Sequence, residues 1–389
     1  MGEPKSAKRK ARAVKFKEVQ ERFGFSLSGL QPFTKDCRKR CWIRDHLGSQ
    51  ECQAVTRRAF QVVAQYAFGR RGRPRFKRKG ALNSVENQCN SQGLRFKDGA
   101  LTWFALTIPV MRDPRDADRY QERALAARVK YPRIVRRELR GRPRWYVQLV
   151  LEGVAPERRL TGAGTVGLDL GPSDVAIVGE TDAVLEGFCP TVKQPWKALR
   201  SIERAMDRSK RANNPDCFNA DGTWKKGARA HNRSRRYQAL AMKRRERERR
   251  LASERKRAHG ELTNRILGQG TDIRLEKLSY RAWQRRYGRS VKVRGAGMFV
   301  ALLTRKAKEA GGQVVEINPY KTRLSQFDHT TGKYVKKPLS QRLHYFGDGI
   351  TAPMQRDLYS AFLARHSGPE ILDISQAIEA WPGAEPLLR

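Results

Sequence analysis

Residues 166–188, VGLDLGPSDVAIVGETDAVLEGF, decide the fold of the C-terminal part of the chain. Three apolar runs, 166–170, 175–178 and 184–188, are separated by short segments rich in Gly, Pro, Ser, Asp and Thr. Apolar runs of this length between turn-forming residues are typical of β-strands joined by tight turns. We therefore expect three consecutive antiparallel strands, with Asp169 inside the first.

Helix and strand patterns alternate after this stretch. Lys and Arg dominate residues 231–257, while Leu251, Ala258, Leu262 and Ile266 keep an apolar seam at helical spacing. Further strands are expected over 272–276 and 314–317, and further helices over 298–310 and 355–364. Three antiparallel strands followed by helix, strand, helix, strand and helix are the order of an RNase H-like fold.

The N-terminal part begins with a basic, weakly apolar segment and then becomes helical. Residues 26–68 show helical spacing, with an apolar stripe at Val55, Ala59, Val62 and Tyr66. This pattern predicts a small helical lobe.

Period-two alternation replaces the helical pattern after residue 93. It is interrupted at Asp98-Gly99 and at 140–143, which predicts two hairpins. Short strands joined by turns favour a small β-barrel. The expected domains are a basic arm and start of the barrel domain (1–25), a helical lobe (26–68), the β-barrel (69–158), the RNase H-like domain (159–366, with an insertion at 318–354) and a peripheral C-terminal tail (367–389).

The charge of the chain indicates a polyanionic partner. Lys and Arg total 81 against 39 Asp and Glu, for a formal net charge of +42. Such an excess opposes compaction unless phosphates neutralise it, so we expect a nucleic acid. No stretch approaches the roughly 18 apolar residues of a membrane helix. Six cysteines in a long, basic chain fit a reducing, nucleoid-associated cytoplasmic setting better than a disulfide framework.

Residues 69–80 are the densest basic segment, and their Gly and Pro forbid a regular helix. A solvated linker is the alternative, but the embedded Phe76 favours a segment that follows a phosphate backbone. The start of the basic helix and the insertion add further cations. The expected nucleic-acid-binding residues are Arg70, Arg71, Arg73, Arg75, Phe76, Lys77, Arg78, Lys79, Arg233, Arg235, Arg236, Lys336 and Lys337.

Three carboxylates are placed where the expected fold would bring them together. Asp169 lies in the first strand, Glu276 ends the fourth strand, and Asp357 lies in the first turn of the last helix. Taken singly, each has an ordinary alternative as a cap or turn former. Together they suit two Mg²⁺ ions, with Mn²⁺ as an alternative, which activate water and stabilise the leaving oxygen of a phosphodiester.

The motifs around these carboxylates resemble those of the TnpB family, RNA-guided nucleases encoded by insertion sequences and related to type V CRISPR effectors. The segments that carry the resemblance are GLDLG (167–171), IRLEKLS (273–279), QRD (355–357) followed by Ser360-Ala361, and KPLSQR (337–342). The resemblance implies a RuvC nuclease domain and a β-barrel wedge domain carrying a small helical recognition insertion.

The resemblance also implies the partners and the reaction. They are a transposon-derived guide RNA, a double-stranded target DNA next to a short adjacent motif, and Mg²⁺-dependent DNA cleavage with Asp169, Glu276 and Asp357 as metal ligands. The alternatives are an RNA-guided DNA-binding repressor without cleavage, and a plain RNA-binding protein, which charge alone would allow.

Two departures from the family pattern matter. The insertion 318–354 contains no cysteine where the family has four zinc ligands, so no zinc is expected there. Its order is then expected to come from Tyr334, Leu339, Leu343, Tyr345 and Phe346. In addition, Leu358-Tyr359-Ser360 replaces the usual Asn-rich continuation after Asp357.

Overall fold

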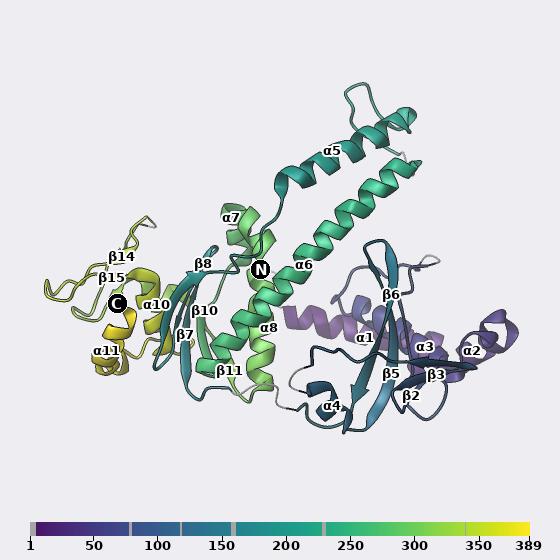
Figure 1. Ribbon diagram of the computed structural model, residues 1–389, viewed down its shortest axis with the longest axis horizontal. Coiled ribbons are helices and arrows are strands. Elements are labelled where there is room, and N and C mark those ends of the chain that lie inside the picture. The colour runs from purple at the N-terminus through teal and green to yellow at the C-terminus, as the bar shows by residue number, and fades with distance from the viewer. Residues whose placement is uncertain (1–4, 78–79, 117–118, 157–160, 228–230, 339) are drawn as a thin grey trace. The chain divides into compact units, whose positions relative to one another are not determined.

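A computed structural model describes residues 5–77, 80–116, 119–156, 161–227, 231–338 and 340–389 (Figure 1). The chain divides into two compact units, Met1–Arg158 and Arg159–Arg389. Both combine helices with small sheets, so the fold is mixed α/β. None of the described helices is both long and apolar enough to cross a membrane.

Helices open the first unit, as predicted for residues 26–68. They are α1 (Lys5–Phe23), α2 (Leu27–Arg40), the 3₁₀ turn η1 (Trp42–Asp45) and α3 (Ser49–Ala67). Ser26 caps α2 by accepting a hydrogen bond from the Gly29 amide at 3.0 Å. Helix α1 covers most of the basic segment expected at residues 1–25.

The helix expected from the spacing of Val55 and Tyr66 is present as α3, but these residues do not form its inward face. Val55 and Tyr66 are 40% and 46% exposed, whereas Glu51 is fully buried. The Glu51 carboxylate accepts a hydrogen bond from the Leu94 amide at 2.8 Å. Because this contact with a distant loop sets the inward face of α3, Cys52 is buried in place of the predicted stripe.

The strands of the first unit form two three-stranded sheets. Their members are β1 (Ser84–Glu86), β5 (Val129–Leu139) and β6 (Arg142–Leu151) in one sheet, and β2 (Arg95–Lys97), β3 (Ala100–Trp103) and β4 (Leu106–Pro109) in the other, with α4 (Tyr120–Leu125) between β4 and β5. Both predicted hairpins are confirmed, and their turns at Asp98-Gly99 and Arg140-Gly141 have positive φ throughout. Barrel closure stays a prediction.

A five-stranded sheet is the centre of the second unit. Its strands are β7 (Thr165–Leu170), β8 (Asp174–Val178), β9 (Ala183–Gly187), β10 (Asp272–Glu276) and β11 (Gln313–Ile317), in the order β11-β10-β7-β8-β9. Strands β7, β8 and β9 are antiparallel neighbours, and β10 is parallel to both β7 and β11. The three strands expected from residues 166–188 are thus present.

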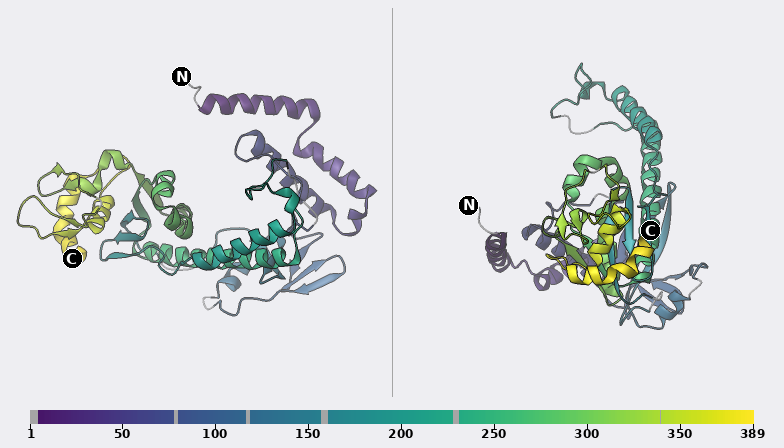
Figure 2. Two further views of the ribbon diagram at one scale, coloured as in Figure 1. Left: turned by 90° about the horizontal axis from the view of Figure 1, so that it is seen from above. Right: turned by 90° about the vertical axis from the view of Figure 1, so that its left-hand side faces the viewer.

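Helices cover both faces of this sheet (Figure 1). One face packs on α6 (Arg235–Gln269) and α8 (Ala296–Glu309), and the other packs on α10 (Arg356–Arg365) and α11 (Ile374–Leu388). Helix α5 (Trp196–Ala212), followed by the turn η2 (Pro215–Cys217), runs beside α6 (Figure 2). The helix α7 (Tyr280–Arg294) was not predicted.

The C-terminal tail is not peripheral, which corrects the expectation for residues 367–389. Ala377 and Trp381 of α11 are buried, and the Trp381 ring lies 5.5 Å from that of Phe362 in α10. The tail therefore completes one of the two hydrophobic cores.

The insertion between β11 and α10 consists of short elements. They are α9 (Pro319–Thr322), η3 (Leu324–Gln326), β12 (Phe327–Asp328), β13 (Lys333–Tyr334), β14 (Leu343–His344) and β15 (Met354–Gln355). Of the residues expected to order it, only Phe346 is confirmed as buried. Tyr334, Leu343 and Tyr345 are exposed, and Leu339 lies outside the described residues.

Histidines take the inward positions in their place. The His344 and Tyr359 rings are 4.3 Å apart, and the His329 and Trp381 rings are also 4.3 Å apart. A hydroxyl–imidazole contact of 2.9 Å joins Tyr359 to His329. The inward face therefore combines these histidines with the apolar residues Leu324, Phe327 and Met354, which are also buried.

Candidate functional site

Gly167 sets the close approach of α10 to the central sheet. A Cβ atom at this position would lie 1.9 Å from the Ala361 carbonyl oxygen and 2.6 Å from the Arg365 amide. No other residue type fits without moving the helix. Strand β7 and helix α10 are therefore in direct backbone contact beside Asp169, two residues further along β7.

Strand pairing places Glu276 next to Asp169. The parallel register of β7 and β10 aligns Leu168 with Leu275, and Asp169 and Glu276 are the next residues along each strand. Because side chains alternate between the faces of a sheet, both carboxylates lie on the face opposite Leu168 and Leu275. That is the face covered by α10.

Asp357 comes from the first turn of α10. Its carboxylate is 3.3 Å from the Arg356 guanidinium and 3.7 Å from that of Arg342. The side-chain oxygen of Gln355 caps the helix by accepting hydrogen bonds from the amides of Asp357 and Leu358, at 2.6 and 3.0 Å. Asp357 is thus the one member of the three that is held by cations.

The electrostatics indicate that the three carboxylates are near one another. Burial raises the pKa of Asp169 well above its ordinary value, and the charges of Glu276 and Asp357 raise it further, against a smaller lowering by Arg356. Burial also raises the pKa of Glu276. Neither Asp169 nor Glu276 makes an ion pair or hydrogen bond through its carboxylate within the described part of the chain.

The donor chemistry of this cluster fits a hard divalent cation, but its arrangement fits only in part. Carboxylate oxygens are the ligands that Mg²⁺ prefers, and a bound cation would offset the repulsion between the neighbouring charges of Asp169 and Glu276. However, no group of three His, Cys, Asp or Glu among the described residues is arranged to hold a metal ion. Asp357 is turned towards its two arginines instead.

The basic segment of the first unit is exposed and irregular, as the sequence suggests. Arg70, Arg71, Arg73, Arg75 and Lys77 are all exposed, and residues 70–77 form neither helix nor strand. Phe76 is fully exposed. None of these side chains makes an ion pair within the described residues. Arg78 and Lys79 lie outside the described residues.

The cations predicted in the second unit differ in their surroundings. Arg233, Arg235, Arg236 and Lys336 are exposed. Lys337 is not: its amino group lies 2.5 Å from Nδ1 of His344, and burial lowers the Lys337 pKa to about 8. This lysine is partly buried in the insertion, unlike the other four cations, and its role in binding nucleic acid stays a prediction.

Sequence reasoning missed two arginines that border the carboxylates. Arg356 is almost buried and donates hydrogen bonds to the carbonyls of Pro338 and Gln341, at 3.3 and 2.8 Å. Arg342 is largely exposed and contacts Asp357. The adjacency of Arg356 to Asp357 was visible in the sequence, but the approach of Arg342 depends on how the insertion folds back.

Comparisons with known proteins give distant structural likenesses only. No protein-family model and no curated protein sequence matches this chain. A solved structure of the Cas12f1–sgRNA–target DNA complex is similar over 80% of this chain and 69% of that chain, with 10% sequence identity and a TM-score of 0.43. A CRISPR–Cas12f ternary complex is similar over 92% and 79%, with 11% identity and a TM-score of 0.31. Because both TM-scores are low, we base the assignment of the site on its own residues.

Proposed function

We propose that this chain is an RNA-guided DNA endonuclease with an RNase H-like, RuvC-type nuclease domain. Its partners are a guide RNA of transposon origin and a double-stranded target DNA beside a short adjacent motif. The observation that supports the proposal is that Asp169 and Glu276 are neighbours on adjacent parallel strands, with Asp357 of α10 near enough to raise the pKa of Asp169. The net charge of +42 supports the polyanionic partners.

The roles of the residues follow from their surroundings. Asp169 and Glu276 would hold a divalent cation, because neither carboxylate makes an ion pair within the described residues and burial raises the pKa of both. Asp357 would join them once Arg342 turns away, since Arg342 is exposed and Arg356 is anchored to the insertion backbone. When bound, Mg²⁺ would supply activation of water for phosphodiester hydrolysis.

Asp169→Asn tests the proposal most directly. We expect DNA cleavage to fall by at least about a thousandfold, because the substitution removes one ligand charge while keeping the side-chain shape. RNA affinity should stay nearly the same, because phosphates are neutralised by Lys and Arg and a metal-binding carboxylate adds little to that. The measurement is a cleavage assay and a gel shift on one preparation, with the RNA that copurifies and added Mg²⁺.

Asp174→Asn is the matched control, because Asp174 is exposed at the start of the neighbouring strand β8. It should cut as the parent chain does. Full cleavage by Asp169→Asn would remove this residue from the active site and overturn the proposal.

A non-cleaving, RNA-guided repressor is the second candidate. It is favoured by the ion pairs that hold Asp357 and by the lack of a ready three-ligand group in the described residues. Guide-dependent DNA binding by the parent chain, with no cleavage at any Mg²⁺ or Mn²⁺ concentration, would support this candidate over the nuclease.

A further inference from the structure

Helix α5 carries four cations along one face. Lys197, Arg200, Arg204 and Arg208 are exposed, and at about 100° per residue they lie within roughly 80° of one another. A shallow groove runs along them and also includes Ser201. The buried residues of the helix lie on the opposite side: Leu199, Ile202, Met206 and Ser209.

These four cations have no carboxylate partner, unlike many of those on the adjacent helix. None of them makes an ion pair within the described parts of the chain. The acidic Glu203 of α5 contacts Arg244 of α6 at 3.3 Å instead. The arginines of α6 that contact carboxylates are Arg244, Arg249, Arg250, Arg257 and Arg265.

The two helices differ in what their charges can do. Paired charges on α6 stabilise the helix, whereas the unpaired cations of α5 can bind a ligand. Glu–Arg pairs three or four residues apart support the helix that carries them. A row of like charges at helical spacing weakens its own helix by similar amounts. The α5 row therefore adds no ion pair to the described chain. A solvated helix face would also align polar side chains, but the four aligned here are all cations without a carboxylate partner.

The spacing of the row matches a phosphodiester backbone. Eleven residues separate Lys197 from Arg208, which is about 16 Å along a helix axis. Phosphates of one strand of a duplex follow each other every ~3.4 Å along the axis, so this length faces roughly five of them. We propose that the α5 face, residues 197, 200, 204 and 208, binds the sugar–phosphate backbone of a nucleic acid strand.

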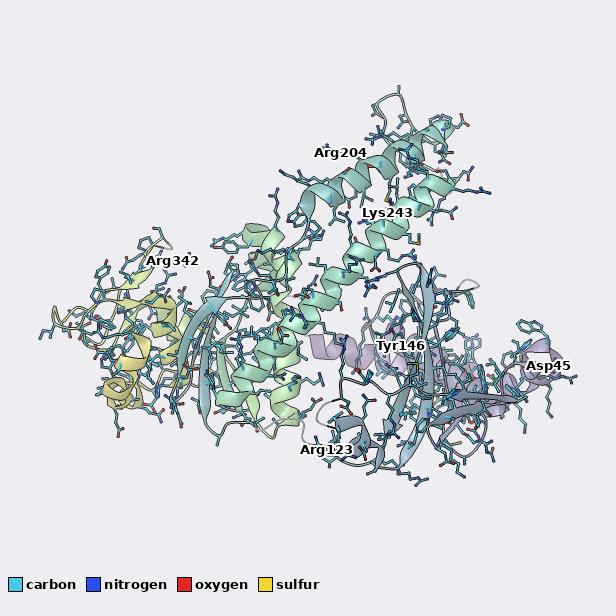
Figure 3. The ribbon with its side chains drawn as sticks, viewed as in Figure 1. Asp45, Arg123, Tyr146, Arg204, Lys243 and Arg342 are labelled. Atoms are coloured by element: carbon cyan, nitrogen blue, oxygen red, sulfur yellow. The ribbon has the colours of Figure 1, made fainter. Side chains whose placement is uncertain are left out.

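Binding at this face follows the backbone and not the sequence. The groove contains no Asn or Gln, the side chains that pair with adenine edges, and its arginines lie in one row without acidic partners to orient them. Arg204 on α5 and Lys243 on α6 are marked in Figure 3. The inference deepens the proposed function and shares with it only the nucleic-acid partner, so cleavage is not needed to test it.

A pair of double variants with equal charge change makes the test. Arg200→Gln/Arg204→Gln removes two unpaired cations, and Arg249→Gln/Arg250→Gln removes two that contact Glu246. Affinity is measured by fluorescence anisotropy in EDTA across a salt series. The probes are polyuridine RNA and a random-sequence DNA duplex, in separate arms.

We expect the α5 variant to bind about tenfold more weakly and to flatten the logarithmic salt slope by about one to two units. The α6 variant should change the slope by less than about half a unit. Arg200→Lys/Arg204→Lys, which keeps the charge, should restore the slope and so rule out a folding defect. The arm in which the slope changes identifies the bound strand as RNA or DNA.

Equal slope changes in the α5 and α6 variants would mean that only overall charge matters, which overturns the proposal. Unchanged slopes in the α5 variant on both probes would overturn it as well. A chain that binds as expected but does not cut DNA would instead contradict the nuclease assignment and leave the α5 surface intact.

Discussion

The carboxylate end of β7 and β10 and the long helix α6 are both dense in charge, but on α6 several arginines are paired with carboxylates. On α6, Arg249 and Arg250 contact Glu246 at 2.7 and 3.0 Å. At the end of the sheet, Asp169 and Glu276 lie together with no such partner in the described residues, and burial raises the pKa of both.

This difference indicates that charged side chains without an ion-pair partner are a better sign of a functional site than a high density of charge. Gathering two buried carboxylates costs folding free energy, because burial and like charge both oppose ionisation. A natural chain keeps such an arrangement where a partner supplies the missing charge. By the same reasoning, the unpaired cations of α5 are candidates for a functional surface, as the carboxylates are for a site. The paired arginines of α6 are not.

The largest effect expected from this comparison is on cleavage by Glu276→Gln. We expect a loss of at least about a thousandfold, because the variant keeps the shape of the side chain and removes the uncompensated charge. Glu316→Gln is the control, since Glu316 is exposed on the adjacent strand β11. The measurement is the initial rate of DNA cutting. A comparable loss in both variants would show that any carboxylate on the sheet affects cleavage, whatever its position.

A smaller effect is expected on stability without metal. Asp169→Asn should raise the melting temperature in EDTA by about 2–4 °C for each kcal/mol of relieved repulsion. Because the folded-state pKa of Asp169 is raised, the parent chain should lose stability as pH rises above about 4, and the variant should lose less. Calorimetry from pH 4 to 8 measures both. A destabilised Asp169→Asn would mean that the carboxylate is already compensated.

His344 is one of two buried histidines of the insertion, with His329, and a smaller effect of pH is expected from it. Burial lowers the pKa of His344 to about 4, and the charge of Lys337 contributes. The neutral form is therefore favoured in the folded chain, and stability should fall as pH drops below about 6.5 towards 4. Hydrogen exchange in residues 318–354 should show this opening, and His344→Gln should reduce its pH dependence. His46→Gln, at an exposed position, should not.

The smallest effect is expected for arginines of α6 that already contact a carboxylate. Arg249→Gln/Arg250→Gln should lower the free energy of unfolding by no more than about 1 kcal/mol, as for other exposed ion pairs. Urea unfolding at low and high salt is the measurement. A loss well above this value would show that α6 depends on its ion pairs, and the comparison with the sheet would then need to be revised.

Local patterns predicted the centre of the second unit well. Strand β7 was recognisable because Val166, Leu168 and Leu170 alternate around Asp169, and β10 because its apolar residues end at Glu276. Their juxtaposition follows from strand order, so it was open to prediction. Whether these residues perform catalysis stays a prediction.

What could not be predicted depends on contacts between distant segments. The inward face of α3 is set by Glu51 and the Leu94 amide, which outweigh the local apolar stripe. The packing of Trp381 depends on α10, and the approach of Arg342 to Asp357 depends on the path of the insertion. The helix α7 was missed because it buries only Val293 and is interrupted at Tyr287, whose φ and ψ are not helical.

The close contact at Gly167 bears on how this chain can vary. The insertion leaves the sheet at Ile317, where the next amide, that of Asn318, donates a hydrogen bond to the Pro369 carbonyl at 2.7 Å, and it returns at Gln355, which caps α10. With both ends held and α10 seated directly on β7, doubling the length of the loop costs only about 0.6 kcal/mol in closure entropy. Added length is therefore tolerated best at the exposed turns of residues 318–354, because the buried Phe327 and Phe346 and the Arg342–Asp357 contact tie the rest of the insertion to α10.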